Sequence, residues 1–300
     1  DETGEILWLA KRPPSCTGFA LARTESGRPL AILTNLEATS DAIATPSATA
    51  FDLHTGDKVW GPVAVTGPYR GPGLVFAAAP QGFMGDTGKK IALHPSSGEV
   101  LEAEDERMSR RIVGEFQETL IGVDAISLTA ERMTDEGERE TLWSLPLADL
   151  GGDPDEIANL ARNIDLGSEY LSVASGKDTL AVLELETGRV VDAHARSVSF
   201  DKQSNTLVVL NRDEVVGVSS NHGSWRTPIA PGATIRGVGG GLVYITTYEA
   251  NVAIDLTDGT LVTPTFAGSA PPGTGPFLPT QTTKGGATIV EHGTTRYLLL

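Results

Sequence analysis

The sequence ATAFDLHTGDKVW, residues 48–60, contains the pattern from which the fold is predicted. Alternate side chains up to Leu53 suit one face of a strand, the dipeptide Thr55-Gly56 follows, and a second stretch ends at Trp60. Alternation with a period of two residues, interrupted by a glycine-containing turn, is typical of a β-hairpin. The glycine supplies the positive φ angle that a tight hairpin turn requires.

Copies of this hairpin recur along the whole chain. Their turns fall at Ser97-Gly98, Thr187-Gly188 and Asp258-Gly259, with weaker copies near Gly137 and Gly223. The N-terminus supplies only a turn at Gly4 and the outgoing stretch EILW, and the C-terminus supplies only the incoming stretch TTRYLLL. Joined end to end, the two termini give one complete copy, which indicates a closed ring.

The spacing of the copies predicts the number of sheets in that ring. Successive turn glycines lie 35 to 52 residues apart, counting the join between the termini, and there are seven such intervals. About 40–50 residues form one four-stranded propeller blade. We therefore expect an all-β chain, a single domain over residues 1–300, folded as a seven-bladed β-propeller of four-stranded antiparallel blades. The last blade is closed by residues 5–9 pairing with residues 295–299, which leaves no unpaired sheet edge between the ends. Six or eight blades would follow if a weak copy has been misassigned.

One segment departs from the strand pattern. Asp153 suits a helix N-cap and Pro154 the first helical position. Apolar residues then recur at helical spacing, at Ile157, Leu160, Ala161 and Ile164. The pattern predicts a short amphipathic helix near residues 154–164, in an insertion over residues 148–166. Its apolar side is expected to pack on the propeller rim, and docking to a partner is the alternative.

Composition and charge exclude several classes of partner. The net charge of −16 argues against binding to nucleic acid or an anionic membrane surface. No apolar run approaches the ~18 residues of a membrane span. The single cysteine, Cys16, excludes internal disulfides. Because the chain opens on Asp1 without a methionine, we expect a trimmed fragment that lost an export signal or anchor, an extracytoplasmic location and a monomer.

The repeat resembles that of the PQQ-type propellers, the quinoprotein dehydrogenase-like family. Ala50, Asp52, Thr55-Gly56 and Trp60 form the most similar copy. A second copy contains Ala253, Asp255 and Asp258-Gly259. The resemblance implies an architecture that enzymes, assembly scaffolds and sensors share, and no particular activity. A quinone-dependent dehydrogenase is expected to carry paired cysteines near its cofactor, so this chain is expected to bind no cofactor.

The sequence offers few candidates for chemistry. It contains no HExxH, CxxC, EF-hand or GxSxG motif, and its five histidines are scattered. Asp201 with Asn205, and Asp255 with Asp258, are compatible with calcium ligation, although hairpin turns prefer the same residues. We expect no metal site and no catalytic residues.

Basic residues on the connections between blades form the candidate binding site. The candidate residues are Tyr69, Arg70, Arg107, Arg110, Arg111 and Arg196. Around a channel mouth they would suit a small anionic ligand such as a carboxylate or phosphate. Glu104, Asp105 and Glu106 share a loop with three of these arginines and would neutralise them in the alternative case.

These observations favour a non-catalytic extracytoplasmic interaction or scaffold module with an unidentified protein partner, such as the soluble domain of an envelope-anchored protein. The alternatives are a propeller-type enzyme, a lyase or hydrolase, and a sensor of a small anionic ligand at the channel mouth. Enzymatic activity is the less favoured interpretation.

Overall fold

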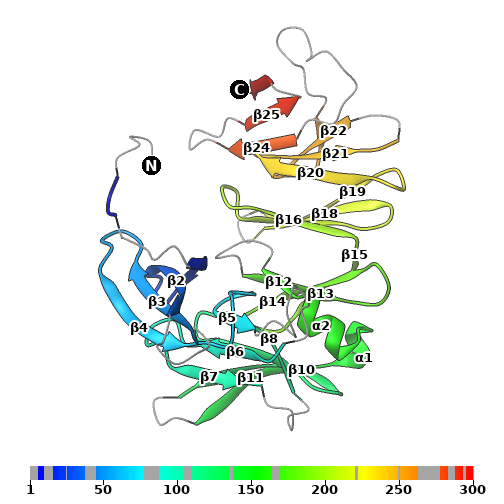
Figure 1. Cartoon of the computed structure of the whole chain (residues 1–300). Helices are drawn as coiled ribbons and strands as arrows, with labels where there is room; N and C mark the ends of the chain where they lie inside the picture. Colours follow the sequence, from blue (N-terminus) through cyan, green and yellow to red (C-terminus); the bar gives the residue numbers. More distant parts are fainter. Residues whose placement is uncertain are drawn as a thin grey trace. The chain divides into compact units, whose positions relative to one another are not determined.

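The computed structural model is built almost entirely from antiparallel strands (Figure 1). It describes residues 6–9, 16–24, 26–37, 45–77, 88–104, 110–134, 138–163, 169–219, 222–248, 251–262, 278–282, 288–292 and 295–299. The chain divides into two compact units, one of residues 1–176 and 183–190 and the other of residues 177–182 and 191–300. The predicted all-β class is confirmed.

The described strands form antiparallel sheets of consecutive strands. Five sheets have four strands each. The first contains β1 (Cys16–Arg23), β2 (Pro29–Glu37), β3 (Thr45–Asp52) and β4 (Lys58–Ala64). The second contains β8 (Arg111–Phe116), β9 (Thr119–Val123), β10 (Ser127–Met133) and β11 (Arg139–Pro146), and the third contains β12 (Arg162–Asn163), β13 (Tyr170–Ala174), β14 (Leu180–Glu184) and β15 (Val190–Ala195). The fourth contains β16 (Ser197–Asp201), β17 (Thr206–Leu210), β18 (Glu214–Ser219) and β19 (Gly223–Pro228), and the fifth contains β20 (Thr234–Gly239), β21 (Leu242–Thr246), β22 (Asn251–Asp255) and β23 (Leu261–Val262). Two sheets have three described strands: β5 (Val75–Ala77), β6 (Lys90–Leu93) and β7 (Val100–Ala103); β24 (Leu278–Thr282), β25 (Thr288–His292) and β26 (Thr295–Leu299).

The predicted hairpin over residues 48–60 is confirmed, and its turn has a defined geometry. The N–H of Gly56 donates to the carbonyl of Asp52 (2.9 Å), and the N–H of Asp52 donates to the carbonyl of Asp57 (2.8 Å). The Asp52 carboxylate accepts the N–H groups of His54 and Thr55 at 2.8 and 3.0 Å. Gly56 has a φ of +77°. The same pair of backbone hydrogen bonds recurs around Gly98, Gly188 and Gly259.

The four tryptophans of the chain are docked in the same way. Each indole N–H donates to a carbonyl three residues before a turn glycine: Trp8 to Leu53 (2.8 Å), Trp60 to Pro95 (2.6 Å), Trp143 to Leu185 (2.8 Å) and Trp225 to Leu256 (2.9 Å). A Cβ at Gly56, Gly98, Gly188 or Gly259 would lie 2.5–2.7 Å from a carbon of the docked ring. Glycine is therefore required at each of these turns for two reasons: the backbone has a positive φ angle, and the indole ring occupies the space of a Cβ atom.

Each unit has its own apolar core. In the first unit, Trp60 belongs to a buried cluster with Leu30, Ile32, Phe76 and Leu93. In the second unit, Trp225 belongs to a cluster with Val208, Val243, Ile254 and Leu256. Trp60 and Trp225, each the third residue of its strand, are therefore packing residues.

The inserted helix is present but shorter than predicted. Helix α2 (Pro154–Leu160) begins at Asp153, whose carboxylate accepts the N–H groups of Asp155 and Glu156. It packs against β8, β9 and β13 through buried Ile157 and Ala158. The prediction is wrong after Leu160, which is 48% exposed, because the chain turns to extended backbone at Ala161 and enters β12. Ile164 lies outside the described residues. A second helix, α1 (Leu147–Leu150), was not predicted.

Two details of the predicted blades differ from the structure. Residues 6–9 belong to no strand, and β5–β7 is a sheet of three strands, with a single bridge between Tyr69 and Phe76 beside it. The pairing of residues 5–9 with residues 295–299 would join the two units and stays a prediction, as does the blade count. The turn expected near Gly137 lies outside the described residues. Among the described residues no helix is long and apolar enough to cross a membrane.

Candidate functional site

The predicted arginines have different surroundings. Arg110 is partly buried, and its Nη1 lies 2.7 Å from Glu131 Oε2 and 3.8 Å from Glu102 Oε2. Its Nη2 donates to Thr129 Oγ1 at 3.2 Å. The neighbouring Arg111 is exposed, with its Nε 3.4 Å from Asp155 Oδ1 at the start of α2. Glu102, Glu131 and Asp155 therefore partly compensate the two charges. Of the carboxylates that the sequence suggested, Glu104 accepts the N–H groups of Lys90 and Ile112, and Asp105 and Glu106 lie outside the described residues.

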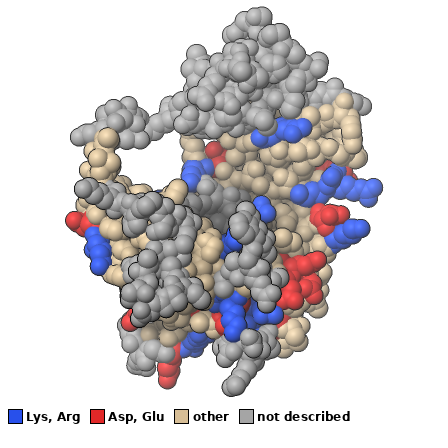
Figure 2. All heavy atoms as spheres, in the orientation of Figure 1, with Lys and Arg blue, Asp and Glu red and all other residues tan. Residues whose placement is uncertain are grey.

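The other predicted residues are distributed over the two units. Tyr69 and Arg70 share the connection over residues 65–74 in the first unit, whereas Arg196 is exposed in the second. Tyr69 is half-buried against Phe76, with ring centroids 6.2 Å apart. Burial raises the pKa of Tyr69, and the charge of Glu115 adds to this effect. Arg107 lies outside the described residues. Figure 2 shows basic and acidic side chains interspersed on the described surface of one face. A common basic site stays a prediction.

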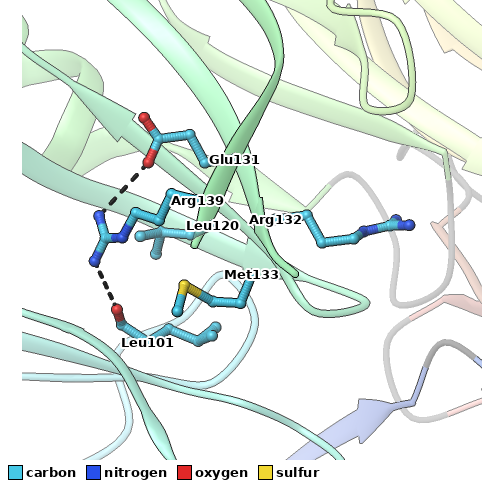
Figure 3. Close-up of a pocket in the computed structure, with 6 residues that line it drawn as sticks. All are labelled: Leu101, Leu120, Glu131, Arg132, Met133 and Arg139. Carbon is cyan, nitrogen blue, oxygen red and sulfur yellow. Dashed lines mark hydrogen bonds and ion pairs between the residues drawn. The ribbon is translucent and has the colours of Figure 1, made fainter. Parts of the chain in front are cut away.

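A charged network joins β7 to the sheet β8–β11. Arg139 Nη1 donates to the buried Glu102 Oε2 at 2.7 Å, and its Nη2 donates to the carbonyl of Leu101 at 2.8 Å. Glu131 Oε2 lies 3.5 Å from Arg139 Nη1 (Figure 3). With Arg110, the network holds two arginines and two glutamates, so its formal charges cancel.

Two residues of this network, Glu131 and Arg139, line a small pocket. The lining residues are Leu101, Leu120, Glu131, Arg132, Met133 and Arg139. Leu101, Leu120 and Met133 lie together on its apolar side, whereas Arg132 points away from them (Figure 3). The apolar side continues into the core between β5–β7 and β8–β11. The arrangement fastens two sheets together through a compensated ion network.

A second cluster centres on Glu115, which sequence reasoning missed. Glu115 is 2% exposed, and its carboxyl group accepts the N–H of Leu74 (2.9 Å) and the N–H of Glu118 (2.9 Å). Its own N–H donates to the carbonyl of Pro72 at 3.1 Å. Burial raises the pKa of Glu115 to about 7, because it disfavours the charged form more than the two N–H groups favour it. The negative charge of Glu118 contributes in the same direction.

Glu118 connects this cluster to a neighbouring hairpin turn. Gln117 and Glu118 form the β8–β9 turn with φ angles of +45° and +74°, which are uncommon for residues other than glycine. The Glu118 carboxylate accepts a hydrogen bond from Ser96 Oγ and lies 3.6 Å from His94 Nε2. His94 occupies the position that Asp52 has in the first hairpin, and its Nδ1 accepts the N–H of Ser96 at 3.3 Å.

A signal for this cluster was present in the sequence. Glu115 interrupts the apolar stretch over residues 112–116, and a charged residue inside such a stretch needs partners when it is buried. One partner, the N–H of Leu74, comes from a connection 41 residues earlier in the chain, so the sequence did not identify it.

Comparisons with known proteins assign neither a family nor a function. No family model and no curated protein matches the chain. Among solved structures, Hsv2 of Kluyveromyces marxianus is similar with 10% identity over 81% of this chain and 76% of that chain, at a TM-score of 0.37. Hsv2 of Kluyveromyces lactis gives 8% identity over 81% and 73%, at a TM-score of 0.35. Sqt1 of Saccharomyces cerevisiae gives 12% identity over 90% and 80%, at a TM-score of 0.34.

Proposed function

We propose that this chain is a β-propeller that serves as a protein-interaction or scaffold module outside the cytoplasm. Serial antiparallel sheets of consecutive strands support the propeller, because each is the repeating unit of that architecture. The identical docking of all four tryptophans supports a regular relation between successive repeats.

The docking of Trp8 supports closure of the proposed ring. Trp60, Trp143 and Trp225 all lie on the outer strand of a sheet and dock on the hairpin of the next repeat. Trp8 docks on the first hairpin in the same way, which supports an outer-strand role for residues 6–9 in a preceding sheet. The sheet β24–β26 contains three described strands. We propose that residues 5–9 are its outer strand and complete a seventh blade.

The observation that carries the interaction function is the contrast between the hairpins and the connections. The hairpin turns share one geometry in four copies, whereas the connections over residues 65–74 and 147–161 differ in length, structure and charge. A rigid scaffold that presents dissimilar connections is suited to selective binding of a macromolecule.

Substitution of the connections tests this function. Partners crosslinked to the wild-type protein in its native cell are identified, and binding of the purified pair is measured. We expect Glu156→Lys with Leu160→Ser on α2, or Arg70→Ala on the 65–74 connection, to weaken binding at least tenfold. The control Asp57→Asn with Lys58→Gln, on an exposed hairpin, should not change it. Equal loss in the control, or a partner that binds all variants equally, would refute the proposal.

A further inference from the structure

The cluster around Glu115 joins three segments of the first unit. Glu115 and Glu118 lie at the β8–β9 turn, Leu74 and Pro72 belong to the connection over residues 65–74, and His94 belongs to the β6–β7 turn. The connection passes very close to β8, because a Cβ at Gly73 would lie 1.7 Å from the carbonyl oxygen of Glu115. The carboxyl group of Glu115 thus fastens the connection to the turn through its hydrogen bonds with the N–H groups of Leu74 and Glu118.

We propose that this fastening is a pH-sensitive switch: a protonated Glu115 holds residues 65–74 against β8, and an ionised Glu115 favours their release. The inference does not depend on the proposed function.

The charge balance around Glu115 explains the direction of the switch. Glu115 is 2% exposed, so its ionisation places a negative charge in a buried site, and the partly buried carboxylate of Glu118 on the adjoining turn adds a smaller repulsion. Release of the connection admits water to Glu115 and removes the cost of burying its charge.

The other titratable groups near the cluster do not neutralise Glu115 through a contact among the described residues. Tyr69 and Arg70 lie on the connection itself, and the Nε2 of His94 faces Glu118. From the elements packed on β8, Lys90 of β6 donates to the carbonyls of Ile112 and Ala158, and Asp155 of α2 lies beside Arg111. On β10, Glu131 is in register with Leu120 of β9, which is in register with Glu115, and the Glu131 carboxylate contacts Arg110 and Arg139. The Nη2 of Arg132 contacts Thr119 Oγ1 at 3.4 Å, and β9 carries no titratable side chain.

The sign follows from proton linkage. Burial raises the pKa of Glu115 to about 7 from an ordinary 4.5, so the closed state binds a proton more tightly than the open state does. Proton binding stabilises the closed state relative to the open state most strongly below pH 4.5, and this stabilisation is lost as the pH rises towards 7. Above pH 7 the free-energy difference between the two states no longer changes. The opening equilibrium constant should increase by about two orders of magnitude over that interval.

Hydrogen–deuterium exchange of the purified protein tests the switch. Exchange of peptides that cover residues 66–76 and 116–120 is measured from pH 5 to pH 8 and corrected for the intrinsic rate. We expect protection in the wild type to fall by about a hundredfold, and protection in Glu115→Gln to stay constant, since its side chain is neutral at every pH. The control is Glu104→Gln, because Glu104 also accepts two backbone N–H groups, those of Lys90 (3.1 Å) and Ile112 (2.7 Å). It should behave as the wild type does.

Two results would overturn the proposal. One is corrected protection of residues 66–76 that does not change with pH in the wild type. The other is an unchanged pH dependence in Glu115→Gln. If that variant does not fold, glutamate labelled with ¹³C at the carboxyl carbon is titrated in the wild type. A Glu115 carboxyl that titrates together with the loss of protection supports the switch, and one that titrates near pH 4.5 refutes it.

Discussion

At the scale of single residues, glycine and tryptophan act as a pair. Gly98 needs its positive φ of +75° for the turn, and a Cβ there would lie 2.6 Å from the ring of Trp60. Gly27 has a similar φ of +81° but nothing within 4 Å of a built Cβ. Substitutions at the two positions therefore separate the free-energy cost of backbone strain from the cost of displacing an indole.

We expect Gly27→Ala to lower the free energy of unfolding by about 1 kcal/mol, through backbone strain alone. Gly98→Ala should lower it by about 3 kcal/mol, because the indole must also move away from the carbonyl of Pro95. Urea unfolding followed by tryptophan fluorescence measures both values. Equal effects of the two substitutions would show that the indole is not held against the turn.

Asp52 should make the first hairpin sensitive to acid. The N–H of Thr55, the Arg28 guanidinium and the N–H of His54 lower the pKa of Asp52 to about 2. Its contribution to stability is present above the ordinary carboxyl pKa of 3.8 and is lost as the pH falls towards 2. Asp52→Asn should therefore destabilise the protein at pH 7 and flatten its acid unfolding curve below pH 4. An unaltered curve relative to the exposed control Asp57→Asn would contradict this assignment.

At the scale of elements, the sequence predicts what is local and misses what joins distant segments. Hairpins, turn glycines and the N-cap of α2 are encoded within a few residues, so periodicity identified them. The end of α2 was wrong because Leu160 suits a helical pattern but the chain must enter β12. The contact between Arg139 and Glu102 spans 37 residues and depends on how two sheets pack, so no local pattern indicated it. Arg110 could be identified as important from its charge, but its partner Glu131 could not.

The network at Glu102 should fasten neighbouring sheets. The side chain of Glu102 is 2% exposed, whereas that of Arg139 is 37% exposed, which moderates the cost of breaking the pair. We expect Glu102→Gln to lower the free energy of unfolding by about 2 kcal/mol, since it leaves Glu131 as the one carboxylate of the network for two arginines. The exposed pair of Arg226 and Glu214 is the control, and Glu214→Gln should cost at most about 0.5 kcal/mol. Similar losses in urea unfolding would show that Glu102 makes an ordinary surface contact.

At the scale of the whole molecule, the main open prediction is closure of the ring. In a Cys16→Ser background, Leu7→Cys is combined in turn with Arg296→Cys, Tyr297→Cys or Leu298→Cys. We expect one combination to form an intramolecular disulfide within minutes of mild oxidation, because strand pairing places facing Cβ atoms about 4.5–5.5 Å apart. Lys58→Cys replaces Leu7→Cys in the control, which should not crosslink. Absence of a crosslink in all three combinations would refute closure.

The docking of each indole on a later part of the chain sets an order for folding during synthesis. The Trp8 indole can dock only after Leu53, 45 residues later in the chain, has been synthesised. The Trp60 indole likewise requires Pro95, 35 residues later. Each of these tryptophans is therefore covered only after a later hairpin has been synthesised, which favours folding from the N-terminus. Translation arrested with residue 60 outside the ribosome and residues 88–104 still inside it should leave the Trp60 indole accessible to quenchers, and arrest that exposes residues 88–104 outside the ribosome should shield it. The repeat thus sets the order in which the tryptophans are buried during synthesis, and Trp8 is buried first.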